Sequence, residues 1–176
     1  MRSSIDFRNL ASRFLTDKLV SMEAPFDETT AYHEAGHAVV ALSLGRTIHR
    51  VSVLPNSDHL GICQFQKGVQ RPTKDWLEEE ILISLGGIVA EARHTGNYEL
   101  GGASRDLRYV RRLAIQRAGE RGAERLEKRL LAKAENLLAD EELWKAIEMI
   151  AAELIRLGRI SGRAARHFYE QCCEEC

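Results

Sequence analysis

Hydrophobic residues recur at the three- and four-residue spacing of a helix over most of the chain. The most apolar of these segments runs from Asp27 to Leu44, where Asp27 can start a helix and Gly45 can end it. The same spacing predicts other helices at Asp6–Val20, at 73–94, from Ser104 onward, at 124–138, at 140–157 and in a short segment after Ser161. We therefore expect a mainly helical protein.

The spacing changes to that of β-strands in one region. Apolar residues at Ile48, Val51 and Val53 predict a strand, and Leu60–Gln66 predicts a second one, antiparallel to the first across the turn residues 55–58. The predicted fold class is therefore mainly α with a small β-sheet (α+β). The expected organisation is an N-terminal amphipathic helix and linker (1–25), one compact domain (26–170) and a flexible, cysteine-rich tail (171–176).

Composition narrows the functional classes. The chain has 176 residues, 44% of them hydrophobic and 29% charged, with a net charge of -1. These values suit one globular domain and lack the basic excess that nucleic-acid binding requires. No apolar stretch reaches the roughly 18 residues of a membrane span, and Met1–Asp6 has no signal-peptide core. We expect a cytoplasmic protein with no membrane span.

The four cysteines do not form a disulfide framework. Three of them crowd the C-terminus, at Cys172, Cys173 and Cys176, and the fourth is Cys63. This usage fits a reducing compartment. A metal site in the tail would need a fourth ligand and a fixed backbone, so we expect a frayed terminus instead.

The predicted helix 27–44 carries an H-E-x-x-H pattern at His33, Glu34 and His37. Residues four apart lie on one face of a helix, so both imidazoles can bind one metal ion. Glu34 is offset by about 100° and can instead reach a water molecule at that ion. Zinc with a carboxylate base is the machinery of peptide hydrolysis. Two surface histidines are the ordinary alternative, but polar groups in so apolar a helix need a partner, and a metal is one.

A catalytic zinc site needs a third protein ligand. A third histidine six residues after His37 is ruled out because Ser43 occupies that position. Local chemistry leaves Asp106 and Glu91 comparable, since an aspartate is also common in the first turn of a helix. The remaining candidates are His49, His59, His94 and Glu99.

Four segments resemble, in the same order, the proteolytic domain of the FtsH family, the ATP-dependent membrane zinc proteases of peptidase family M41. They are the zinc helix Ala31–Ala38, the strand and turn Val51–Pro55 with Leu60-Gly61, the L-G-G-x-x-A-E segment Leu85–Glu91, and the G-A-x-x-D-L segment Gly102–Leu107. The similarity extends over about residues 29–168, so that residues 26–170 are identified as an M41-like zinc peptidase domain.

The resemblance implies roles for particular residues. It implies that Asp106 is the third zinc ligand beside His33 and His37, with one zinc ion per chain. Apart from the resemblance, zinc-bound histidines commonly donate their other ring N–H to a carboxylate, a role open to Glu91; the alternative is that Glu91 only caps a helix or pairs on its surface. Val51, Ser52, Val53 and Leu54 would form a strand that binds substrate by backbone pairing.

The resemblance is incomplete. The family carries transmembrane helices and an AAA+ ATPase ahead of the protease, but the sequence contains no G-x-x-x-x-G-K-S/T pattern. We therefore expect a metalloendopeptidase (a zinc hydrolase) that cuts unfolded or flexible polypeptides with Glu34 as general base and without its own ATPase. The alternatives are a catalytically silent zinc-containing peptide-binding module and a protease subunit that depends on a partner. The expected partners are a polypeptide substrate and either a homo-oligomer or a separate ATPase or scaffold.

Overall fold

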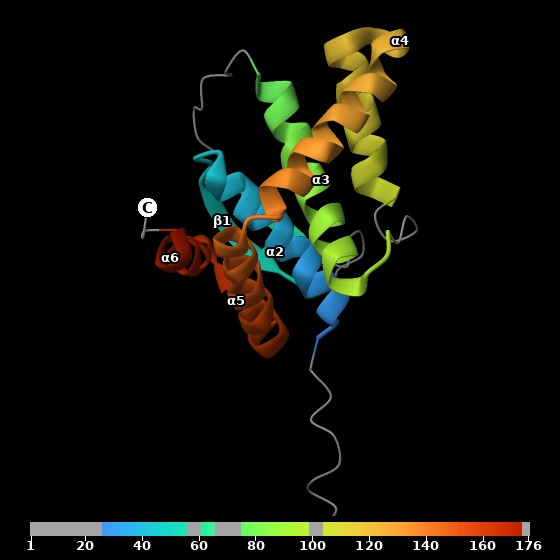
Figure 1. Ribbon diagram of the computed structural model, residues 1–176. Helices are drawn as coiled ribbons and strands as arrows, with labels where there is room; N and C mark the ends of the chain where they lie inside the picture. The colour runs from blue at the N-terminus through green and yellow to red at the C-terminus, as the bar shows by residue number, and fades with distance from the viewer. Residues whose placement is uncertain (1–25, 56–60, 66–74, 99–103, 174–176) are drawn as a thin grey trace, which may run out of the picture.

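The computed structural model describes residues 26–55, 61–65, 75–98 and 104–173, which form five helices and one three-stranded sheet (Figure 1). This architecture confirms the predicted mainly α class with a small sheet. The predicted helix Asp6–Val20 lies outside the described residues. No helix in the described ranges has both the length and the apolar character needed to cross a lipid bilayer.

Helix α2 (Glu28–Ser43) is the central element of the fold. It begins where predicted, because the Asp27 carboxylate accepts a hydrogen bond from the Thr30 backbone N–H at 2.7 Å. It ends before Gly45, whose φ of 72° lies in the left-handed region. The helix packs against α3, α5 and β1, so its side chains are buried on all faces from residue 33 to 42. The polar side chains of this segment, His33, Glu34 and His37, are therefore buried between neighbouring elements of the fold.

Helix α3 (Trp76–Thr95) crosses α2 closely because both helices carry glycine at the crossing. A Cβ atom added to Gly36 would collide with the backbone carbonyl of Gly86, and one added to Gly86 would lie 2.6 Å from a methyl group of Val40. Gly86 and its neighbour Gly87 would weaken α3 as an isolated helix, but the close packing on α2 leaves no room for a side chain at either position. The helix starts after Asp75, and the predicted start at residue 73 lies outside the described residues.

Helix α4 (Ser104–Leu138) doubles back on itself, as its yellow and orange halves show in Figure 1. The reversal occurs at Gly119, with φ 69° and ψ 168°. The two helices predicted from Ser104 and over 124–138 are therefore both present, and they meet at this reversal. Helix α4 packs on α3, and its first turn brings Asp106 within 3.2 Å of His33 on α2.

The sheet has the order β2-β1-β3 and is antiparallel throughout. The predicted pair is confirmed as β1 (Ile48–Ser52) and β2 (Ile62–Phe65), with Val51 opposite Cys63. The third strand, β3 (Arg159–Ser161), was not predicted. It pairs with the free side of β1, so β1 is the central strand and β2 is an edge strand.

The C-terminal helices cover the side of α2 opposite the α4 hairpin (Figure 1). Helix α5 (Glu141–Leu157) starts at the Asp140 cap and ends at Gly158, as predicted. Helix α6 (Gly162–Cys173) starts with the Ser161 hydroxyl accepting from the Ala164 N–H at 3.2 Å. Residues 171–173 belong to this helix, and Cys172 is buried against Met149. Three residues that the prediction assigned to a flexible tail therefore continue helix α6, and residues 174–176 lie outside the described residues.

Candidate metal centre

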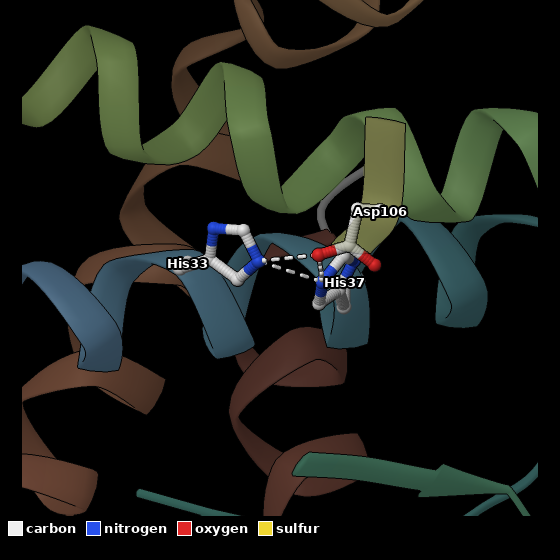
Figure 2. Close-up of side chains that lie close together, drawn as sticks. All are labelled: His33, His37 and Asp106. Carbon is white, nitrogen blue, oxygen red and sulfur yellow. Dashed lines mark hydrogen bonds and ion pairs between the residues drawn. The ribbon is translucent and has the colours of Figure 1, made fainter. Parts of the chain in front are cut away.

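His33 and His37 present their Nε2 atoms to the same point in space. The two atoms are 3.0 Å apart, one helical turn along α2. Asp106, in the first turn of α4, places Oδ2 3.2 Å from the His33 nitrogen and 3.8 Å from the His37 nitrogen (Figure 2). The three ligand atoms all lie within 4.8 Å of one another. Residues 73 positions apart in the sequence thus converge on one site.

Both rings are oriented by a hydrogen bond from the opposite nitrogen. His33 Nδ1 lies 2.8 Å from the carboxylate oxygen Oε2 of Glu91, and His37 Nδ1 lies 2.7 Å from the backbone carbonyl of Ile83. Because both acceptors can only accept, each Nδ1 carries the proton, and each Nε2 can offer a lone pair to the shared point. Ligating histidines in metal sites are held in this way. Glu91, itself buried, thus occupies the place expected of a residue behind a ligand.

The charges of this cluster favour a bound cation. Burial lowers the pKa of His33, but hydrogen bonds to Asp106 and Glu91 outweigh burial and raise that pKa to about 10. Burial raises the pKa of Asp106, but the two histidines hold it below its ordinary value. Without a metal ion, a proton on His33 Nε2 supplies positive charge to this cluster, and a metal ion that took its place would leave Nε2 with its lone pair as a ligand. Two imidazoles and one carboxylate match a catalytic zinc site, which uses three protein ligands and leaves one position open.

Glu34 is buried next to this cluster without a full set of partners. Its Oε2 is one of three buried side-chain polar atoms in the described residues that lack a hydrogen bond. Burial raises its pKa, and the nearby His37 and His33 oppose that rise. The chain passes close over it just before β2: a Cβ atom on Gly61 would lie 2.6 Å from Glu34 Oε1. A buried carboxylate with an unsatisfied oxygen is suited to accept a proton from water.

A cavity of about 340 Å³ opens beside Glu34, His37 and Asp106. Its other lining residues come from β2, α3 and α4; they are Gly61, Ile62, Cys63, Phe65, Glu80, Ile83, Ser84, Arg105 and Tyr109. A second cavity, of about 360 Å³, lies between the C-terminal ends of α3 and α4 and is lined by none of the candidate ligands. The first cavity is therefore the one where a substrate would meet the cluster.

The other candidate ligands are not part of the cluster. His49 is exposed on β1, and His94 stacks on Tyr32 with ring centres 3.7 Å apart. His59 and Glu99 lie outside the described residues. Local sequence chemistry could not decide between Asp106 and Glu91 as the third ligand. In the structure, Asp106 lies at Nε2 of His33, the nitrogen that faces His37, and Glu91 lies at Nδ1, on the other side of the ring.

The predicted substrate strand needs a correction. Val51 and Ser52 lie in β1, where β2 and β3 occupy both sides. The Val53 N–H donates to the Gly158 carbonyl at 2.9 Å, and Leu54 follows beyond the strand. The edge strand beside Glu34 is instead β2. Sequence reasoning missed this because three residues of β3, far along the chain, decide which strand is central.

Gly87 makes room for the His37 ring. A Cβ atom there would lie 2.6 Å from both His37 Cε1 and Nε2. We predict that Gly87→Ala displaces the ring, weakens zinc binding and lowers the stability of the metal-free protein by about 1–3 kcal/mol, as overpacking does. Zinc titration and thermal unfolding measure both effects. Gly122→Ala, on α4 away from the site, is the control and should leave zinc affinity unchanged. Unaltered zinc affinity in Gly87→Ala would contradict the tight fit.

Glu91→Gln keeps the shape of the side chain but removes the charge that holds His33. We expect zinc affinity to fall about 10- to 100-fold, the usual loss when a group behind a ligand is changed. Competition with a zinc-binding dye measures the change. Glu148→Gln, an exposed carboxylate on α5, should have no effect. Equal affinities for Glu91→Gln and wild type would show that Glu91 only fills space.

Comparisons with known proteins give one consistent result. The sequence profile of peptidase family M41 matches residues 20–146. The ATP-dependent zinc metalloprotease FtsH of Pelobacter propionicus is 39% identical over 94 residues, 48% of this chain and 14% of that protein. The FtsH of Syntrophotalea carbinolica is 37% identical over 108 residues, 56% of this chain and 16% of that protein. The matched segment thus covers about a sixth or less of the length of these relatives.

Proposed function

This chain belongs to peptidase family M41, and from that premise we propose that it is a zinc-dependent endopeptidase that hydrolyses unfolded or flexible polypeptides. The observation that carries the proposal is the convergence of His33, His37 and Asp106 beside the buried Glu34. Relatives named as zinc metalloproteases match about half of the chain. A purely structural metal site would have no use for the unsatisfied Glu34 carboxylate.

His33, His37 and Asp106 would hold one zinc ion, with Glu91 and the Ile83 carbonyl fixing the two rings. Zinc supplies Lewis acidity, which polarises a peptide carbonyl and makes a water molecule more acidic. Glu34 accepts a proton from the water whose oxygen attacks the carbonyl carbon. The same carboxyl then gives that proton to the nitrogen as the C–N bond breaks. The products are a carboxylic acid and an amine, which become carboxylate and ammonium when the acid's proton passes to the amine, and Glu34 is regenerated.

The edge of β2 supports an extended substrate. One side of Ile62–Phe65 pairs with β1, and no strand of the described chain pairs with the other side. A peptide can add to such an edge by backbone hydrogen bonds, which read no particular sequence. Only a polypeptide without stable structure can adopt the required extended form. Hydrolysis of a chain that is already unfolded would need no ATPase, although unfolding a stable protein would.

Metal removal tests the proposed function. We expect the zinc-loaded protein to cut unfolded casein without nucleotide and to leave a stably folded protein intact. Chelation should abolish cleavage, and one equivalent of zinc should restore it. Mass spectrometry of the fragments measures the cut sites. One bound zinc per chain with no cleavage by the wild type would instead favour a silent peptide-binding module or a subunit that needs a partner.

A further inference from the structure

Side chains from three helices form an aromatic stack outside the cavity beside Glu34. Tyr32 of α2 lies parallel to His94 of α3, with ring centres 3.7 Å apart, and the Tyr32 ring centre is 5.8 Å from that of Trp144 on α5. The Arg93 guanidinium carbon lies 4.2 Å from the Trp144 ring centre. None of these four side chains is fully buried. Tyrosine, tryptophan and arginine are the residue types that dominate the energetics of protein–protein contacts.

The cavity of about 360 Å³ between the C-terminal ends of α3 and α4 adjoins this stack, because Arg93 belongs to both. Tyr98 and Glu135 also line the cavity, and the Tyr98 hydroxyl donates to Oε1 of Glu135 at 2.5 Å. The apolar part of the lining consists of Val89, Ala92, Leu138 and Ala139. The cavity therefore offers an aliphatic surface with a carboxylate beside it.

The basic side chains of this region are already paired. Arg93 donates one hydrogen bond to the Leu138 carbonyl, and its Nη2 lies 3.1 Å from Oε1 of Glu141. His94 places Nε2 3.5 Å from Oε1 of Glu28. The charge of Arg93 is thus matched within the chain, and a protonated His94 would be matched in the same way.

Two carboxylates of the region are not matched. Among the described residues, no lysine or arginine forms an ion pair with Glu135 or Glu148. Burial, and then the hydrogen bond and charge of Glu135, raise the pKa of Tyr98 to about 12. Burial, and then the charges of Glu148 and Glu28, raise the pKa of Tyr32. Both phenols therefore remain uncharged, and a cation placed here would meet unneutralised negative charge.

We propose that Tyr32, Tyr98, Trp144, Glu135 and Glu148 form an aromatic–acidic surface that binds a lysine- or arginine-bearing segment of another polypeptide. The cavity takes the aliphatic stem of the basic side chain, and the charged end lies against the carboxylates and the aromatic rings. Charge complementarity selects this occupant. The surface shares no residue with the His33, His37 and Asp106 cluster, so the inference goes beyond the proposed function and does not depend on it.

The two tryptophans supply a reporter and an internal control for nuclear magnetic resonance. Trp144 belongs to the surface, whereas Trp76 lies at the opposite end of α3 from the cavity. The Glu34→Gln variant prevents cleavage while blocked peptides Gly-Leu-Xaa-Leu-Gly are added, with Lys, Arg, Gln or Glu at Xaa. We expect the Lys and Arg peptides to shift the Trp144 indole N–H signal and to bind about threefold or more tightly than the other two. The Trp76 signal should stay in place.

Charge-neutralising variants locate the binding surface. In the same background, Glu135→Gln and Glu148→Gln should each raise the Kd of the Lys peptide about two- to fivefold and leave that of the Gln peptide unchanged. Glu120→Gln, an exposed carboxylate near the reversal of α4, should change neither. Sodium chloride at about 0.5 M should weaken binding of the Lys and Arg peptides alone. All three replaced side chains are exposed, and an unmoved Trp76 signal verifies that the fold is intact.

Three results would overturn the inference: equal affinities for the four peptides, an undiminished Lys preference in the Glu135→Gln/Glu148→Gln double variant, or a Trp144 signal that no peptide moves. The last would follow if a second copy of the chain, or its own residues 1–25, covered the surface. Spermidine, a free polyamine, should bind more weakly than the Lys peptide because it lacks apolar side chains, and equal affinity would overturn the assignment to a polypeptide. No step measures cleavage, so the outcome is distinguishable from failure of the proposed function.

Discussion

Replacing Glu34 by Gln will abolish peptide cleavage and leave zinc bound. The amide has nearly the shape of the carboxylate but cannot accept a proton from water. General-base catalysis contributes about 10²- to 10⁴-fold, so the residual kcat should fall by at least that order. The ligand atoms of His33, His37 and Asp106 are untouched by this change. A parallel assay of zinc content and casein cleavage measures both quantities on one preparation.

The Glu34→Gln result needs a control for folding. Glu34 is buried and one of its oxygens lacks a hydrogen bond, so the neutral amide should not lower the free energy of unfolding. Thermal unfolding of variant and wild type should therefore agree, or favour the variant. Cleavage at wild-type rate in Glu34→Gln would remove this residue from the mechanism.

Replacing Asp106 by Ala will remove most of the affinity for zinc. The carboxylate is the only described group from outside α2 that reaches both histidine nitrogens. Its loss should exceed the roughly 10- to 100-fold weakening expected for Glu91→Gln, because a ligand rather than a supporting residue is removed. Isothermal titration with zinc measures the affinity.

Stability supplies a second measurement for Asp106→Ala. Zinc that binds only the folded chain raises the unfolding temperature, and a variant that does not bind loses that increase. Glu120→Ala, an exposed carboxylate on the same helix, should keep the full increase. If Asp106→Ala binds zinc as tightly as Glu120→Ala, then Asp106 is not a ligand and the third position belongs to another residue.

Much of the fold was predictable because its signals are local. The start of α2 at Asp27 and the end of α5 at Gly158 follow from capping chemistry that a short segment carries by itself. The pairing of His33 with His37 also follows from helix geometry alone. The reversal at Gly119 was not predicted, since a glycine within a polar, helix-forming segment gives no sign of where the chain turns.

The remaining features depend on residues far apart in the sequence. Strand β3 has three residues, too few to show an alternating pattern, yet it decides that β2 is the edge strand. Asp106 and Glu91 look alike in sequence, and only the packing of α3 and α4 around α2 assigns them to opposite sides of His33. Arg46, in the connection between α2 and β1, forms ion pairs with Glu79 and Glu80 on α3, far later in the chain, and no local pattern connects them.

The location of zinc tests the central claim most directly. Crystals of the zinc-loaded protein, measured on both sides of the zinc absorption edge, give a map in which only zinc contributes a difference peak. We predict one peak per chain, bonded to Nε2 of His33, Nε2 of His37 and a carboxylate oxygen of Asp106. A peak at Cys172 and Cys173, or no peak between the two histidines at full zinc loading, would contradict a catalytic zinc centre on α2.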